Sequence, residues 1–322
     1  MNELDFCRNN GKVSAASRRC VINVWCASIM QLTRQPPPRR AVRLLAIRTL
    51  AGIFLAMVAY NAPARDIGDP KLKSSSVLIV DQSDSSVLYA RHPDVAAPIA
   101  SITKLMTALV VLDARQPLDE PLQITEADRD FPKAAFSRLT VGATLSRGDL
   151  MHLALMSSEN RAAHALGNNY PGGISAMVSA MNAKAARLGM SNTHFVDSTG
   201  LSSQNVASPE DLSRLVIAAS KNSTIREYST DKNYAVRVHR RLIEYRNTDN
   251  LVANPAWNII VQKTGYIAEA GKCLVMAAVI EGRSVVIVLL DSLGKYTRVA
   301  DAKRIKMWME ASSNPRLRVS MR

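Results

Sequence analysis

The sequence predicts an α+β fold in which an antiparallel sheet is flanked by helices and an all-helical region is inserted between its strands. Three observations lead to this prediction. Runs rich in β-branched residues occur near both ends of residues 65–322, and helix-forming segments with capping residues lie between them. Only Glu281 and Gly282 join the last two strand-like runs, as in an antiparallel hairpin. Strands from both ends of a domain that share one sheet leave the helices between them as an insertion.

The predicted strands form two groups. In the first group, residues 75–80 and 86–90 are separated by the turn-forming sequence Asp-Gln-Ser-Asp and are expected to form a hairpin. The second group lies near the end of the chain and comprises residues 257–261, 273–280 and 284–290.

The predicted helices carry recognisable start and stop signals. Ser101 precedes the apolar helix 102–112, and Ser146 is a candidate N-cap for the helix 145–156. A third helix, 174–188, ends at Gly189, and Ser208-Pro209-Glu210 opens a fourth. Residues 295–309 are expected to form a closing helix.

Residues 1–64 are predicted to be an N-terminal leader with a signal peptide. Four arginines precede the apolar run 49–60, and Ala-Pro-Ala follows at 62–64. This run is shorter than the roughly 20 residues that a membrane-spanning helix needs. An uncleaved anchor over residues 44–60, allowing peripheral membrane association, is the alternative, and Met30 is an alternative start to Met1. Both alternatives place residues 65–322 in the periplasm.

Composition narrows the classes of partner and cofactor. The formal net charge is +14, but nine Lys and Arg against two acidic residues place half of this excess in residues 1–64. The mildly basic remainder gives no reason to expect a nucleic-acid partner. Cys273 is the single cysteine after the leader, so no disulfide can form within residues 65–322. No Cys/His spacing is typical of zinc, and no metal or cofactor is expected.

The first motif with chemical content is Ser-Ile-Thr-Lys at residues 101–104, at the start of a helix. Positions i and i+3 share one helical face, so the Lys104 amine can reach the Ser101 hydroxyl. A serine becomes a good nucleophile when an adjacent base takes its proton, and burial can lower a lysine pKa enough for that role. Alone, the pattern is also compatible with an N-cap serine and a solvated lysine.

Two further motifs add polar groups. Ser158-Glu159-Asn160 lies at a junction between two helices, where a hydroxyl and a carboxamide can face one cleft. Lys-Thr-Gly at 263–265 is expected to end the strand that begins near Trp257, where a cation and a hydroxyl can hold a carboxylate and glycine lets a substrate backbone approach. A capped helix turn and an ordinary strand terminus are the structural alternatives.

The order and context of the three motifs resemble the active sites of penicillin-binding proteins and serine β-lactamases. The resemblance covers roughly residues 72–312 and implies a β-lactamase/DD-peptidase-like fold. It is closest to the low-molecular-mass D-alanyl-D-alanine endopeptidases. Glu159 also points to them, because the larger carboxypeptidases usually have Gly there. Those larger carboxypeptidases also carry an extra β-domain. The stretches that carry this resemblance are residues 100–108, 155–163, 181–185, 257–259, 263–265 and 294–297.

The resemblance implies acyl transfer on peptidoglycan stem peptides, with β-lactams as covalent inhibitors. Ser101 would be the nucleophile, Lys104 the general base and Ser158 a proton relay. The substrate-binding groups would be Asn160, Lys263, Thr264 and Gly265. The oxyanion hole would combine the Ser101 N–H with that of Tyr266 or Ile267.

The sequence leaves three rival functions. A carboxypeptidase would use the same residues. A class A β-lactamase needs an E-x-x-L-N loop, and none occurs between Asn160 and Lys263, where Glu210-Asp211-Leu212 instead looks like a helix start. A catalytically silent peptidoglycan-binding module is disfavoured by the intact motifs.

Overall fold

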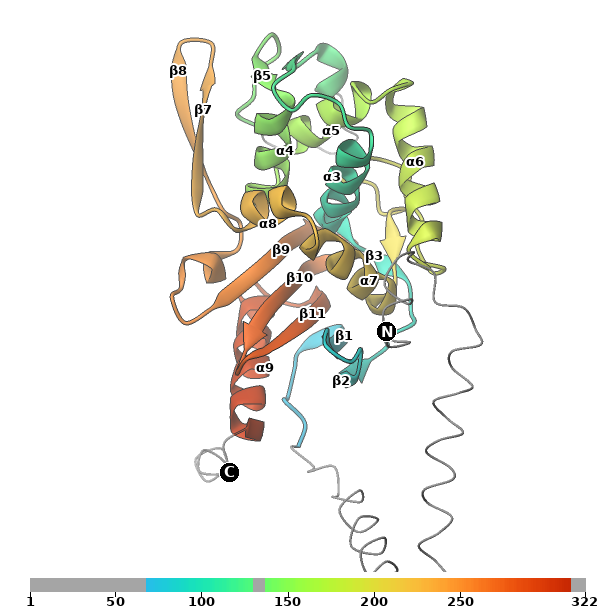
Figure 1. The fold of residues 1–322 in the computed structure, drawn as a ribbon, viewed down its shortest axis with the longest axis vertical. Coiled ribbons are helices and arrows are strands. Elements are labelled where there is room, and N and C mark those ends of the chain that lie inside the picture. The colour runs from blue at the N-terminus through green and yellow to red at the C-terminus, as the bar shows by residue number, and fades with distance from the viewer. Residues whose placement is uncertain (1–67, 130–136, 314–322) are drawn as a thin grey trace, which may run out of the picture. The chain divides into compact units, whose positions relative to one another are not determined.

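A computed structural model describes residues 68–129 and 137–313, so the predicted leader lies outside the described residues. Its main sheet has five antiparallel strands in the order β2-β1-β11-β10-β9 (Figure 1). The N-terminal hairpin joins the C-terminal strands because β1 pairs with β11, which confirms the predicted sheet. The strands are β1 (Ser74–Asp81), β2 (Val87–Arg91), β9 (Asn258–Ile267), β10 (Gly271–Ile280) and β11 (Arg283–Ser292).

The turn between β10 and β11 has the predicted two-residue form. Glu281 and Gly282 have φ angles of 50° and 74°, which is the backbone of a type I′ hairpin. Strand β9 runs two residues beyond the Lys-Thr-Gly motif, at which the prediction ended it. It continues to Ile267 because β10 pairs with it as far as Gly271. The Lys-Thr-Gly motif therefore lies within a strand, and its polar residues interrupt the apolar pattern that marks the strand in the sequence.

Helices cover both faces of this sheet. Alternate residues of β10 and β11 enter two separate apolar clusters, one with Ile305 of α9 and the other with Leu215 of α7. Figure 1 shows α9 (red) on one side of the sheet and α7 and α8 (gold) on the other. The helices are α3 (Thr103–Asp113), α4 (Arg147–Met156), α5 (Asn160–Asn168), α6 (Gly173–Arg187), α7 (Pro209–Ser220), α8 (Ser223–Thr230) and α9 (Thr297–Ser313).

The capping predictions hold for two helices. The Ser146 side chain accepts a hydrogen bond from the Asp149 N–H and caps α4, and Ser208 caps α7 in the same way. Helix α4 begins later than predicted because residues 144–146 form a short strand, β5 (Thr144–Ser146), which pairs with β4 (Pro121–Gln123). Ser101 lies in a 3₁₀ turn, η1 (Ala100–Ile102), directly before α3.

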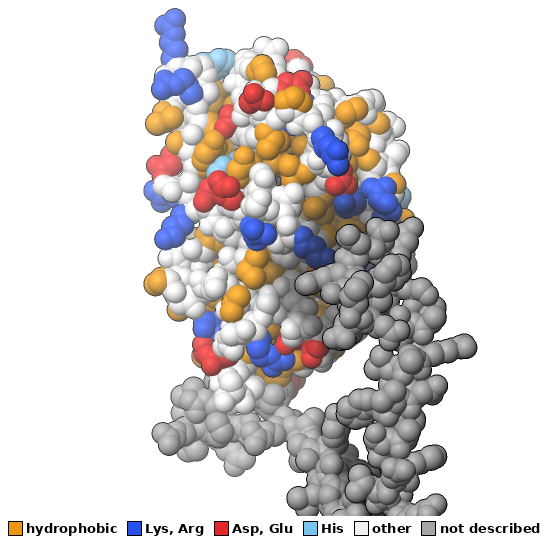
Figure 2. Space-filling model, in the orientation of Figure 1, with side chains coloured by type: hydrophobic (Ala, Val, Ile, Leu, Met, Phe, Trp, Pro, Cys, Tyr) orange, Lys and Arg blue, Asp and Glu red, His pale blue; other side chains and the backbone are white. Residues whose placement is uncertain are grey.

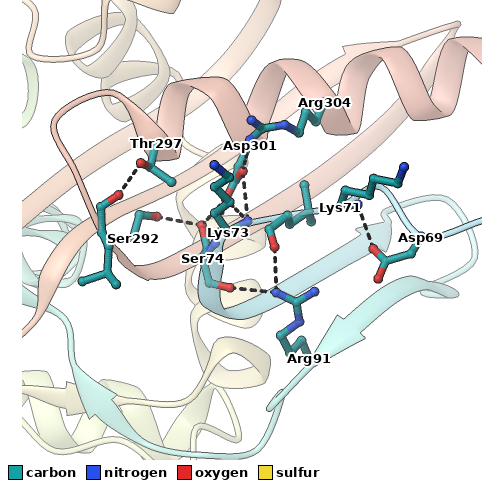
Figure 3. Close-up of polar contacts among 11 residues, drawn as sticks. Asp69, Lys71, Lys73, Ser74, Arg91, Ser292, Thr297, Asp301 and Arg304 are labelled. Atoms are coloured by element: carbon teal, nitrogen blue, oxygen red, sulfur yellow. Dashed lines mark hydrogen bonds and ion pairs between the residues drawn. The ribbon is translucent and has the colours of Figure 1, made fainter. Parts of the chain in front are cut away.

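Helix α9 is tied to the start of β1 by a buried carboxylate (Figure 3). Both oxygens of Asp301 accept from the Lys73 N–H, at 3.1 and 3.0 Å. One of them also accepts from the Ser74 N–H at 2.8 Å and the Ser74 hydroxyl at 2.7 Å. The Arg304 guanidinium adds an ion pair at 2.6 Å. This cluster fixes the closing helix against the opening strand.

A second hairpin was not predicted. It consists of β7 (Asn233–Val238) and β8 (Arg241–Arg246), which pair along their whole length. Val236, Val238 and Tyr245 are buried, but charged residues alternate with them and weaken the strand pattern in the sequence. Figure 2 shows Lys and Arg side chains (blue) at the upper left, where Figure 1 places the tip of this hairpin. No helix in the described ranges is long and apolar enough to cross a membrane.

Candidate active site

The three motifs come together around the Lys104 amine. Its Nζ lies 2.8 Å from Ser101 Oγ, 2.8 Å from Asn160 Oδ1 and 2.6 Å from the Thr199 carbonyl oxygen. The first motif is thus in direct contact with the second. The third motif lies against the same turn, because a Cβ atom on Gly265 would lie 3.3 Å from the Ser101 nitrogen.

The backbone before Ser101 is strained and tightly packed. Ala100 has a φ of 48°, a left-handed conformation that non-glycine residues rarely adopt. Its carbonyl oxygen accepts from the Thr103 hydroxyl at 2.8 Å. Gly200 packs directly on this carbonyl, since a Cβ there would lie 1.9 Å from the Ala100 oxygen. These contacts hold the turn that presents Ser101 at the start of the helix.

The partners of Lys104 define its protonation chemistry. Burial lowers the Lys104 pKa to about 7, although the charges of Asp197 and Glu159 oppose the shift. The Asn160 and Thr199 oxygens can only accept, so they take the two N–H bonds of a neutral amine. The remaining lone pair then faces Ser101 Oγ, which is the one partner that can donate. All three hydrogen bonds of the Lys104 nitrogen are therefore satisfied when Lys104 is a neutral base.

A loop absent from the sequence prediction positions the Thr199 carbonyl. Asp197 Oδ1 accepts from the N–H groups of Thr199 and Gly200, both at 2.6 Å, and from the Thr199 hydroxyl at 2.8 Å. Its other oxygen accepts from the Ser202 N–H at 3.0 Å. The signal in the sequence is Asp-Ser-Thr-Gly at 197–200, since Asp often organises a turn through such bonds.

The Ser158-Glu159-Asn160 motif lies at the junction of α4 and α5, as predicted, and Asn160 is the first residue of α5. Ser158 is half-buried with a φ of 61°, and it is not among the three polar partners of Lys104 in the described structure. Glu159 is buried and caps α5 by accepting from the Arg161 N–H at 3.2 Å. Burial raises the pKa of the Glu159 carboxyl. Asn160 is the member of this motif that contacts the lysine.

The β9 motif supplies a second buried lysine. The Lys263 Nζ donates to the Thr264 carbonyl at 2.9 Å. Its pKa lies well below the usual value, because the amine is desolvated and because Lys104 and Arg298 are positively charged. The Thr264 hydroxyl hydrogen-bonds the Thr248 hydroxyl at 2.7 Å. Lys263 and Thr264 therefore lie on the strand whose Gly265 packs against the Ser101 turn, and burial disfavours the charged form of the Lys263 amine.

Gly265 is required by packing as well as by any substrate. A side chain there would place Cβ 2.8 Å from the Ile99 carbonyl oxygen, at the strained turn. The Gly265 carbonyl accepts from the Arg298 guanidinium of α9 at 3.0 Å. Sequence reasoning missed Arg298 and Thr248, because nothing in their local sequence connects them to a motif on β9.

The described residues offer no group of three His, Cys, Asp or Glu side chains that could hold a metal ion. The histidines of helices α4 and α5 have structural contacts. His152 stacks between the rings of Tyr228 and Tyr234, and His164 bonds Asp128 at 2.9 Å.

Comparisons with known proteins agree with this geometry. A model of the D-alanyl-D-alanine carboxypeptidase family matches residues 63–294. A D-alanyl-D-alanine endopeptidase of Pseudomonas aeruginosa is 47% identical over 274 residues, which cover 83% of this chain and 88% of that protein. An Escherichia coli protein of the same name is 44% identical and covers 85% of this chain and 89% of its own length.

Solved structures show the same fold. The Streptomyces K15 DD-transpeptidase superposes with a TM-score of 0.71 at 29% identity, covering 76% of this chain and 99% of that chain. A D-alanyl-D-alanine carboxypeptidase from Mycobacterium tuberculosis gives 0.71 at 28% identity, over 77% and 95%. The predicted β-lactamase/DD-peptidase-like fold is confirmed. The chain therefore belongs to the D-alanyl-D-alanine carboxypeptidase family of serine hydrolases, and within it resembles the endopeptidases of the penicillin-binding protein 7 type.

Proposed function

We propose that this chain is a serine DD-endopeptidase that hydrolyses D-alanyl–diaminopimelyl cross-links in peptidoglycan through a Ser101 acyl-enzyme. The observation that carries the proposal is the contact of Ser101 Oγ with a buried lysine amine whose pKa is about 7. The endopeptidase names of the two relatives above support the choice of substrate.

In the first half of the reaction, Lys104 takes the Ser101 proton as Oγ attacks the D-alanyl carbonyl carbon. The tetrahedral intermediate then expels the amine of the partner strand, which receives a proton from Lys104, with Ser158 as relay. In the second half, water attacks the ester with Lys104 as base and releases Ser101. Both steps need the neutral amine at the start.

The remaining groups hold the substrate and the developing charge. The N–H of Ser101 and that of Tyr266 or Ile267 form the oxyanion hole. Asn160 binds a substrate amide while it orients Lys104. β9 is an edge strand of the sheet, so the substrate backbone adds to it beside Gly265. Lys263 and Thr264 hold the polar groups of the substrate, and no metal or cofactor takes part.

The proposal includes export. Residues 1–64 act as a leader with a signal peptide, and residues 65–322 form the DD-peptidase domain in the periplasm, where its peptidoglycan substrate lies. The arginine-rich segment before an apolar run and the Ala-Pro-Ala at 62–64 support this. N-terminal sequencing of the periplasmic protein should begin at or close to Arg65. A sequence that reads back into the apolar run would favour the anchored form.

Two assays test the enzymatic proposal. Fluorescent penicillin should label the wild-type protein covalently, and Ser101→Ala should remove the label without loss of the folded state. Undiminished labelling of Ser101→Ala would overturn the mechanism. Purified cross-linked muropeptide dimers should fall to monomers on incubation with enzyme. If dimers persist while pentapeptides lose D-alanine, the chain is a carboxypeptidase, as the family model's description would suggest.

A further inference from the structure

A charged groove of about 510 Å³ opens beside the second motif. Both of its walls lead into the active site. Ser157 and Glu159, on one wall, flank Ser158. Arg246, on the other wall, precedes by two residues Thr248, whose hydroxyl contacts Thr264. The complete lining is Arg138, Ser157, Glu159, Glu244, Tyr245 and Arg246.

One cation of this groove is held in place. The Arg138 guanidinium donates to the Glu244 carbonyl at 2.7 Å, and its carbon lies 3.9 Å from the centre of the Tyr245 ring. Tyr245 itself is buried, so the guanidinium rests on a rigid aromatic surface. A fixed guanidinium binds an anion at a small cost in side-chain entropy.

The other charges are available to a ligand. Arg246 is exposed, and its side chain makes no hydrogen bond or ion pair with any residue in the described part of the chain. Glu244 is also exposed, and one of its oxygens accepts from Asn233 Nδ2 at 2.9 Å. On β8 these two residues are separated by one position, so their side chains leave the strand on the same face. A cation and an anion thus share one face of β8 at this groove.

We propose that this groove binds the free amino-carboxylate end of a diaminopimelyl residue in the stem that acylates Ser101. The inference rests on the proposed function and specifies its substrate. Arg246 and Arg138 bind the carboxylate, and Glu244 binds the ammonium. In a cross-link the acceptor's diaminopimelyl amine is acylated, whereas the donor residue before D-alanine keeps both groups free. The paired charges therefore match the donor stem and not a lone carboxylate.

The test compares three donor stems in otherwise identical dimers, using the full chain. The donor carries diaminopimelate, diaminopimelate with its free carboxylate amidated, or lysine, which lacks that carboxylate. We expect kcat/KM for diaminopimelate to exceed both others by about tenfold, as for a charge-assisted contact. Arg246→Gln should lower the first value about tenfold and remove the preference. Arg241→Gln is the matched control, an exposed arginine of β8 outside this groove, and should change nothing.

A separate experiment tests the proposed contact of Glu244 with the ammonium. Glu244→Gln should lose the preference for a free amine over an N-acetylated one, while it keeps the preference for the carboxylate. Equal rates on all donors by the wild-type enzyme would overturn the inference, as would an equal loss on all donors in Arg246→Gln.

Penicillin labelling separates this inference from the proposed function, because penicillin carries no diaminopimelyl group. Normal labelling of Arg246→Gln together with lost donor preference supports the groove. Absent labelling of the wild-type protein would instead overturn the Ser101 mechanism. If the wild-type protein labels but does not cleave dimers, the same donors are compared as pentapeptides through D-alanine release, since the groove reads only the donor side.

Discussion

Two buried ionisable side chains behave in opposite ways. Asp301 in α9 is fully buried and contacts two backbone N–H groups, a hydroxyl and a guanidinium. Lys104 in α3 is 1% exposed, and its contacts are three neutral oxygens. The carboxylate has a cation at hydrogen-bond distance, whereas the amine has its nearest acids outside contact. Asp301, whose charge is in contact with a cation, anchors α9 to β1. Lys104, whose charge has no acid in contact, is a base that titrates near neutral pH.

The largest expected effect comes from making the Lys104 charge permanent. Arginine is protonated at every accessible pH, so Lys104→Arg removes the base while it keeps a cation. Acylation by fluorescent penicillin should slow by about a thousandfold, within the range for loss of general base catalysis. Far-UV circular dichroism should show the fold retained. Acylation within about tenfold of the wild-type rate would show that Lys104 is not the base.

The pH profile tests the same contrast without a mutation. Only neutral Lys104 accepts the Ser101 proton, and the Lys104 pKa is about 7. Acylation should therefore be nearly constant at pH 8 and above up to mild alkali, and should fall about tenfold per unit well below pH 7. Stopped-flow labelling across pH 5 to 9 measures this limb. A flat profile across pH 5 to 7 would mean that the amine does not control the rate.

Substitution of Asp301 should lower the stability of the fold and leave the acylation rate unchanged. Asp301→Asn keeps the shape but removes the charge that holds the Ser74 N–H and Arg304. We expect the free energy of unfolding to fall by about 2 kcal/mol, the scale for hydrogen bonds to a charged group. Urea denaturation measures it, with Asp84→Asn in an exposed turn as control. Penicillin acylation by the folded variant should stay near the wild-type rate, and a large rate loss would erase the contrast between the two regions.

The smallest effect is expected for Asp197, which acts on Lys104 by its charge and on the loop structure by its hydrogen bonds. The Asp197 charge raises the Lys104 pKa and its oxygens order the loop that presents the Thr199 carbonyl. Asp197→Asn should shift the acid limb of the acylation profile to lower pH and slow the plateau by about tenfold, the scale of one weakened polar contact. Asp113→Asn, at a surface ion pair with Lys184, should leave both unchanged. A limb that moves to higher pH would contradict the role of the Asp197 charge.

The features that could be predicted from the sequence are those that depend on residues close together in the chain. Ser101 and Lys104 share a helical face, so their contact could be expected from spacing alone. The caps Ser146 and Ser208 were predicted because capping is local. The order of the motifs then suggested that Asn160 and Lys263 lie nearby, and the structure places Asn160 Oδ1 against Lys104 Nζ. The role of Ser158 as relay stays a prediction, and so does the leader over residues 1–64.

What could not be predicted depends on contacts between distant segments. Strand β9 continues past the Lys-Thr-Gly motif to Ile267 because β10 pairs with it, which a reading of apolar runs cannot detect. The β7–β8 hairpin was missed because its charged residues are interleaved with the three buried ones. Arg298 reaches the Gly265 carbonyl from the closing helix, 33 residues away. None of these contacts leaves a local signature in the sequence.

The pairing of β1 with β11 has a consequence for how the molecule folds. Ser74 is the register partner of Ser292, so the middle of the sheet joins segments from opposite ends of the described chain. During synthesis, β1 and β2 can form their local hairpin early, but the sheet cannot close until residues 283–292 have emerged. Such long loop closures are slow. We therefore expect a late, rate-limiting closure step, after which β9 meets the Ser101 turn and the enzyme first becomes able to react.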